Sequence, residues 1–258
     1  MASMPGAERR PRTMAFGIWL ATQAGVARIG LALGAGVAVA VGLFAFGHAG
    51  PLASRLPTLA AMGVAWSAGI SVAFGGALLA LRNDVEQGVV TLARLRGVRL
   101  FAYARGRVYG LTVLIAVAVG AATLGIGIAT TFAAADRAAA ARETMAALAY
   151  ALAFAVTMGP LAMATVGTGA RIVGYLSLAT VVVVPELLAG WTSSLLPRGW
   201  YELTSIPSAL AAVAAGVRFG GPSLWHMTRA LAALAAIVAA SLAVVWARLA
   251  RAEAVAES

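Results

Sequence analysis

The sequence predicts an all-α membrane protein that crosses the bilayer several times. Hydrophobic residues make up 62% of the chain, and its mean hydropathy is +0.91. Charged residues make up only 11%, too few to cover the surface of a soluble domain of 258 residues. The long apolar runs lack the alternation of a β-barrel. They therefore indicate helices, because a chain in lipid must satisfy its own backbone hydrogen bonds.

Six apolar segments are long enough to cross a bilayer, whose ~30 Å hydrocarbon core needs about 20 helical residues. They lie at residues 29–47, 59–81, 108–132, 145–166, 172–190 and 230–247. We predict a single six-span domain over residues 29–258. In its first span, Gly30 and Gly34 form a G-x-x-x-G pattern, typical of close helix packing or of dimerisation.

The residues before the first span, 1–28, are predicted to be a basic cytoplasmic lead followed by an interfacial helix. Thr13 can cap this helix, Trp19 lies on its apolar side, and Gln23 and Arg28 supply a polar side. A cleaved signal peptide is the alternative. Its apolar region would be shorter than the nineteen residues of the run at 29–47.

The arginines predict the orientation of the chain. An even number of spans places both termini on one side. Thirteen arginines lie on the side of the termini and of residues 82–107, and six lie on the other side. The positive-inside rule then places both termini in the cytoplasm of a multi-pass protein of the cytoplasmic (inner) membrane. The net charge of +10 is explained by lipid headgroups and topology, so we expect no nucleic-acid partner.

The sequence lacks the residues that ATP hydrolysis, metal binding and thiol chemistry require. The chain has no lysine, so it lacks the Walker A lysine of an ATPase site, and it has no cysteine for a thiolate site. His48 and His226 each lack a second metal ligand at helical spacing, and the acids are scattered among different loops. We expect no metal, no cofactor and no catalytic residue in this chain.

Residues 82–107 concentrate charge between the second and third spans. The segment holds six arginines, whose insertion into hydrocarbon would cost about 15–20 kcal/mol against about 3–5 kcal/mol gained from its apolar residues. It must therefore lie outside the bilayer, on the cytoplasmic side. The positive-inside rule alone explains each arginine individually, so a more specific role depends on the other residues of the segment.

A short helix is predicted inside this charged segment. Asn83 and Glu86 have the spacing of a capping box, and Gly88 and Gly97 interrupt the run that follows. Between the two glycines we expect a short amphipathic helix over Val89–Arg96. Such a projection suits insertion into a groove of a partner protein.

The segment resembles the loop after the second span in permease subunits of ABC-2 type transporters. The resemblance rests on Asp84, Glu86, Gly88, Leu92, Arg99 and the pair Gly106-Arg107, with Val89 and Arg107 where the family often has Thr and Lys. It implies a coupling helix that docks on a separate nucleotide-binding ATPase subunit, which holds ATP and Mg²⁺. The implied docking residues are Asp84, Glu86, Gly88, Val89, Leu92, Arg94, Arg96 and Arg99.

The family resemblance also implies the function. The chain would be a permease that works with a second copy or a similar subunit and exports a hydrophobic or amphipathic substrate. A haem-exporter-like permease of cytochrome c maturation is a near alternative, since it shares the Asp-x-Glu-x-Gly loop and a proline near the end of the fifth span. An ATP-independent carrier or a membrane scaffold is the alternative from another class.

The segment between the last two predicted spans is long yet apolar. Ser205 and Pro207 can open a helix through Ala209–Val217, which Gly220 and Gly221 close. About ten helical residues cannot cross a bilayer. We predict a re-entrant or interfacial hairpin on the outer side, with an ordinary external loop as the alternative.

A pathway or outer gate is predicted beside this hairpin. Glu186 follows Pro185 in the fifth span, and an ionisable residue in a membrane helix indicates a functional site. A hydrated carboxylate at a helix end disturbed by the proline is the alternative. The aromatic residues that follow suit a membrane–water boundary. The predicted gate residues are Glu186, Trp191, Trp200 and Tyr201.

Overall fold

The computed structural model describes residues 15, 18–19, 25–47, 56–78, 80–167, 171–195, 205–221 and 223–257. In these residues the chain forms helices and no strand, which confirms the all-α class. The helices are α2 (Gly25–Gly47), α3 (Leu56–Val64), α4 (Ile70–Ala77), α5 (Ala80–Glu86), α6 (Val89–Leu95), α7 (Leu100–Ala133), α8 (Arg137–Ala162), α9 (Arg171–Leu195), α10 (Ile206–Phe219) and α11 (Ser223–Glu257). Two π-helical turns, η1 (Ala65–Gly69) and η2 (Met163–Gly167), interrupt the series.

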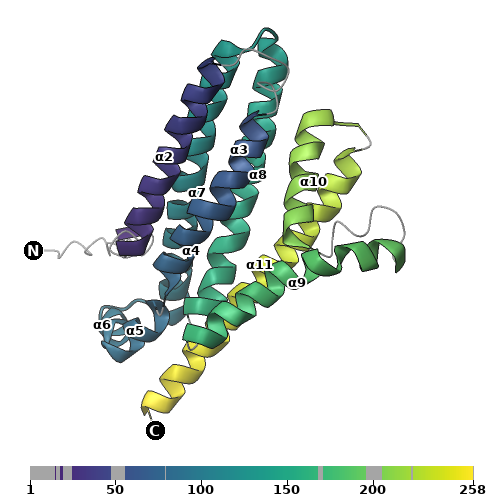
Figure 1. Ribbon diagram of the computed structural model, residues 1–258. Helices are drawn as coiled ribbons and strands as arrows, with labels where there is room; N and C mark the ends of the chain where they lie inside the picture. Colours follow the sequence, from purple (N-terminus) through teal and green to yellow (C-terminus); the bar gives the residue numbers. More distant parts are fainter. Residues whose placement is uncertain are drawn as a thin grey trace, which may run out of the picture.

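Helices α7 and α8 form the antiparallel centre of the bundle (Figure 1). Helices α2 and α3 pack against this pair on one side, and α10 and α11 pack against α8 on the other. The largest side chains buried between the helices include Leu111, Ile115, Tyr150 and Phe154. The α5–α6 end of the bundle also contains the start of α7 and the C-terminal end of α11 (Figure 1).

Four helical stretches of the described residues are long and apolar enough to cross a membrane. They are Leu56–Glu86, Leu100–Ala133, Arg137–Gly167 and Ser223–Arg251. By their length and composition, these helices indicate a membrane-embedded chain. The predicted first and fifth spans fall within α2 and α9, which are 23 and 25 residues long. The predicted interfacial helix over 13–28 lies mostly outside the described residues.

The second long stretch is not a continuous α-helix. It widens at η1 and breaks at Leu78, whose backbone is non-helical with ψ 109°. Trp66 in η1 packs edge-on against Phe154, with ring centroids 5.4 Å apart, and donates a hydrogen bond of 2.7 Å to the Tyr150 hydroxyl. The π turn therefore fixes this stretch against the middle of α8.

The G-x-x-x-G pattern of the first span packs inside the chain. A Cβ on Gly30 would lie 2.6 Å from Val72 Cγ2, and one on Gly34 would lie 3.4 Å from the Ala68 side chain. Small residues thus let α2 approach η1 and α4 closely. Of the two roles expected for this pattern, close helix packing and dimerisation, the structure shows the packing.

The predicted helix between the last two spans is confirmed as α10. Ser205 is its N-cap and accepts a 3.1 Å hydrogen bond from the Ser208 amide, while Gly220 ends the helix with φ 60°. Helix α10 packs against both α8 and α11, which also contact each other. Helix α11 begins at Ser223, well before the predicted start of the last span at residue 230.

Helix α9 excludes the alternative reading of Glu186 as a residue at a helix end. The sequence allowed a helix end next to Pro185, but the helix continues to Leu195. It bends instead of ending, and its C-terminal part points sideways, away from the rest of the bundle (Figure 1). A proline removes one backbone hydrogen bond of a helix and often kinks it without terminating it. Glu186 therefore lies within the helix.

Candidate partner-docking site

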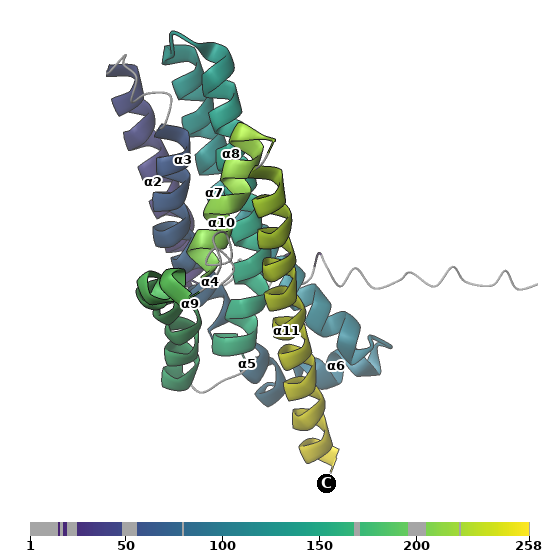
Figure 2. The same cartoon turned by 90° about the vertical axis from the view of Figure 1, so that its right-hand side faces the viewer.

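Helices α5 and α6 form a hairpin at one end of the bundle, and α6 projects to the side (Figure 2). Gly88, between them, has φ 70°, and Gly97, after α6, has φ 77°. Gly97 donates to the Arg94 carbonyl at 2.8 Å and Val98 to the Ala93 carbonyl at 3.0 Å, the Schellman pattern that closes a helix. These reversals confirm the short helix that the glycines predicted.

A buried ion pair joins this hairpin to α7. Arg107 donates to Asp84 from Nε at 2.7 Å to Oδ2 and from Nη2 at 3.0 Å to Oδ1. The Tyr103 hydroxyl also donates to Oδ2, at 2.6 Å. Asp84 and Arg107 are only 5% and 7% exposed. A two-point ion pair of this kind fixes both distance and orientation. Asp84 therefore positions the hairpin and does not lie on its surface.

The capping box predicted for Asn83 and Glu86 is wrong. Asn83 lies inside α5, which begins at Ala80, so it cannot cap that helix. Glu86 instead accepts a 2.6 Å ion-paired hydrogen bond from Arg82 Nε, one turn earlier, with both side chains more than half exposed. The helix starts earlier than predicted because Ala80 and Leu81 are buried in the bundle and remain helical.

The outer side of the hairpin combines exposed apolar and basic residues. Leu92 is 58% exposed and Leu95 is 79% exposed, while Val90 is buried against the bundle and Val89 is half-buried. We call the exposed set the docking face; it consists of Glu86, Leu92, Arg94, Leu95, Arg96 and Arg99. Exposed leucines flanked by arginines suit a partner groove that has apolar walls and an acidic rim.

The predicted gate residues are only partly placed. Glu186 is exposed and accepts a 2.6 Å hydrogen bond from the Ser205 hydroxyl, which joins α9 to the start of α10. Trp191 is 77% exposed. Trp200 and Tyr201 lie outside the described residues. The structure therefore identifies Ser205 as a hydrogen-bond partner of Glu186.

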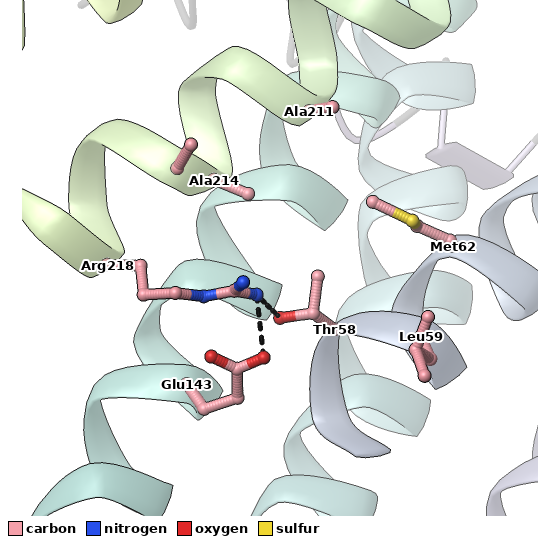
Figure 3. Close-up of a pocket in the computed structure, with 8 residues that line it drawn as sticks. Thr58, Leu59, Met62, Glu143, Ala211, Ala214 and Arg218 are labelled. Carbon is pink, nitrogen blue, oxygen red and sulfur yellow. Dashed lines mark hydrogen bonds and ion pairs between the residues drawn. The ribbon is translucent and has the colours of Figure 1, made fainter. Parts of the chain in front are cut away.

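A second polar cluster was not predicted from the sequence. Arg218 Nη2 donates to Glu143 Oε1 at 2.6 Å and to the Thr58 hydroxyl at 2.9 Å (Figure 3). This ties the end of α10 to α8 and α3, opposite the α5–α6 hairpin. The available signal was that Glu143 and Arg218 lie in segments predicted on the same side of the membrane, but their separation of 75 positions gave no reason to pair them.

Comparison with known proteins yields no relative of this chain. No protein-family model, no curated protein and no solved structure matches it. Among the described residues, no group of three or more potential metal-ligating side chains lies together.

Proposed function

We propose that this chain is the membrane-spanning permease subunit of an ATP-driven transporter of the ABC-2 type. In this proposal the α5–α6 hairpin docks on a separate nucleotide-binding ATPase subunit. The supporting observation is that the hairpin turns Leu92 and Leu95 outward while the buried pair of Asp84 and Arg107 holds it against α7. A partner can therefore bind the exposed side of the hairpin and, through the ion pair on its buried side, move α7.

The ion pair gives the hairpin a mechanical connection to the rest of the bundle. Helix α7 has 34 residues and packs against α8, α2 and α3. When an ATPase subunit shifts the docking face, the two-point contact at Arg107 resists sliding and carries the shift into α7. Nucleotide state then biases a two-state arrangement of the helices. ATP and Mg²⁺ belong to the partner, because this chain has no lysine for a Walker A site.

The proposed transporter pairs this chain with a second permease copy or a similar subunit, and a hydrophobic or amphipathic substrate is exported along a pathway between them. Both termini lie in the cytoplasm. The arrangement of charge supports this orientation. The hairpin and the C-terminal end of α11 lie at the same end of the bundle, and the sequence predicts thirteen of the nineteen arginines on that side of the membrane.

Co-purification tests the docking proposal. The chain is expressed with candidate ATPase subunits, extracted in mild detergent and captured, and the ATPase retained per permease is measured. Truncating two apolar anchors, in Leu92→Ala with Leu95→Ala, is expected to reduce retention by roughly tenfold or more. Two exposed leucines of α11 provide the matched control, Leu231→Ala with Leu242→Ala, which should retain the ATPase fully.

Two outcomes would contradict this function. One is that none of the candidate ATPases co-purifies with the unaltered chain, which would favour an ATP-independent carrier or a scaffold. The other is equal loss of ATPase in the α6 and α11 variants, which would point to general damage rather than to a docking face.

A further inference from the structure

A cavity of about 310 Å³ lies among α3, α8 and α10 (Figure 3), at the end of the bundle opposite the α5–α6 hairpin (Figure 1). Its polar side is formed by Thr58, Glu143 and Arg218. Its apolar side includes Leu59, Met62 and Ala211. A cavity of this size with mixed lining is typical of sites for small amphipathic molecules.

The polar side of the cavity has no net charge. Arg218 and Glu143 are paired at 2.6 Å, and the carboxylate side chain is only 7% exposed. An anionic ligand would have to displace Glu143 from the guanidinium, and a cationic ligand would have to displace Arg218 from the carboxylate. An uncharged head group binds without breaking this pair.

One donor of the cluster is left unmatched. Arg218 Nε is buried and has no hydrogen-bond partner among the described residues, although Nη2 of the same side chain serves two acceptors. Buried donors without an acceptor are rare, because their lost hydration is not replaced. Nε itself is closed off from the cavity, so a ligand meets the accessible part of the guanidinium, where an ester, ether or hydroxyl oxygen can accept a hydrogen bond.

The cavity also reaches the outer surface of the bundle. Leu59 lines it and is 58% exposed. In a membrane-embedded helix such an exposed leucine faces acyl chains. A ligand with an aliphatic tail can therefore enter sideways from the bilayer, with its tail along Leu59 and Met62 and its head toward Arg218.

We propose that this cavity is a binding site for lipids with an uncharged, oxygen-bearing head group, such as a monoacylglycerol. The accessible part of the Arg218 guanidinium donates to a head-group oxygen, Thr58 lies beside it, and the first carbons of the acyl chain contact Leu59 and Met62. The site is complete within one chain, so it does not depend on the ATPase or on the proposed transport function.

Photolabelling of the full chain in phosphatidylcholine vesicles tests the proposal. The probe is a monoacylglycerol with a diazirine near the head end of its acyl chain, and labelled residues are mapped by peptide mass spectrometry. We expect label concentrated on Leu59 and Met62 and abolished by excess unlabelled monoacylglycerol. A fatty acid and a lysophosphatidylcholine with the same diazirine chain should label these residues roughly tenfold less.

Two variants separate the cavity from general lipid contact. Ala211→Leu fills the cavity without touching the charged pair and should reduce labelling by about tenfold. Ala141→Leu, on the exposed side of α8, is the matched control and should leave labelling unchanged. Arg218→Lys keeps the charge opposite Glu143 but removes the planar guanidinium donors, and it should reduce labelling by about threefold or more.

Three results would overturn the proposal. The first is that excess unlabelled monoacylglycerol fails to reduce the labelling of Leu59 and Met62 in the unaltered chain. This measurement does not depend on the folding of any variant. The second is labelling of the exposed leucines of α11 as strong as that of Leu59. The third is stronger labelling by the fatty acid than by the uncharged probe.

Discussion

Asp84 is a buried carboxylate, and neighbouring side chains must compensate its negative charge. Its two oxygens accept three hydrogen bonds, two from Arg107 and one from Tyr103. Removing one partner of such a pair leaves the other charge buried without compensation, which costs more than the pair contributes when intact. The stability of the docked hairpin therefore depends on this one side chain.

Replacing Asp84 by Asn tests this dependence. Asp84→Asn keeps the size of the side chain but leaves Arg107 unpaired, and it is expected to weaken the contact between hairpin and α7 by about 3–5 kcal/mol. The matched change Glu86→Gln breaks an exposed pair and should cost about 0–1 kcal/mol. Hydrogen exchange over residues 80–98, with thermal unfolding in detergent, measures both. Equal effects of the two changes would contradict a structural role of Asp84.

The pairing of Asp84 with Arg107 illustrates what sequence reasoning misses at this scale. Both residues belong to the motif that suggested docking, but they are separated by 23 positions. Whether they meet depends on two chain reversals, at Gly88 and Gly97, whose direction in space no local pattern specifies. The prediction therefore placed Asp84 on the docking face, whereas it lies beneath it.

At the scale of single elements, the hairpin depends on the backbone of Gly88. Its φ of 70° is a left-handed conformation that costs other residues about 1–2 kcal/mol. A Cβ at this position would meet no atom within 4 Å, so the penalty of a substitution is one of backbone strain and not of collision. Strain and packing can therefore be separated experimentally.

Gly88→Ala is expected to destabilise the hairpin by about 1–2 kcal/mol. Gly120→Ala in α7 also adds a methyl group into open space, but at a helical position, where it should be neutral or stabilising by about 0.5–1 kcal/mol. Hydrogen exchange of α6 amides in the two variants measures the difference. A Gly88→Ala protein that protects α6 as well as the unaltered chain does would contradict the strain argument.

Elements with local signals were predicted well, and those shaped by neighbours were not. Helix α10 was predicted from its Ser205 cap and its terminal glycines, and α6 from Gly88 and Gly97. The course of α9 was not predicted, because a proline alone does not determine whether a helix bends or ends. The cluster of Arg218, Glu143 and Thr58 was missed for a similar reason, since it joins three helices that are distant in sequence.

At the scale of the whole molecule, the distribution of arginines predicts which end of the bundle faces the cytoplasm. The chain has no cysteine, so any introduced cysteine is a unique label. Ala135 lies between α7 and α8, and Gln87 lies at the turn between α5 and α6; both are exposed. The α7–α8 turn and the α5–α6 turn lie at opposite ends of the bundle (Figure 1).

A membrane-impermeant maleimide can therefore determine the orientation. In intact cells Ala135→Cys is expected to react within minutes, whereas Gln87→Cys should react only after the membrane is permeabilised. The physical reason is the positive-inside rule, which opposes transfer of the six arginines of residues 82–107 across the membrane. Labelling of Gln87→Cys alone in intact cells would reverse the proposed topology.

The π turn at Ala65–Gly69 has a consequence for how this bundle tolerates changes in chain length. A π turn holds about one residue more than an α turn, which amounts to about 100° of rotation along the helix. Before it, α3 directs Thr58 toward Arg218; after it, α4 directs Val72 toward Gly30. Deleting one residue here would restore a regular helix and leave one of these two contacts facing the wrong way. The register between the two ends of the molecule is thus set by a single inserted residue.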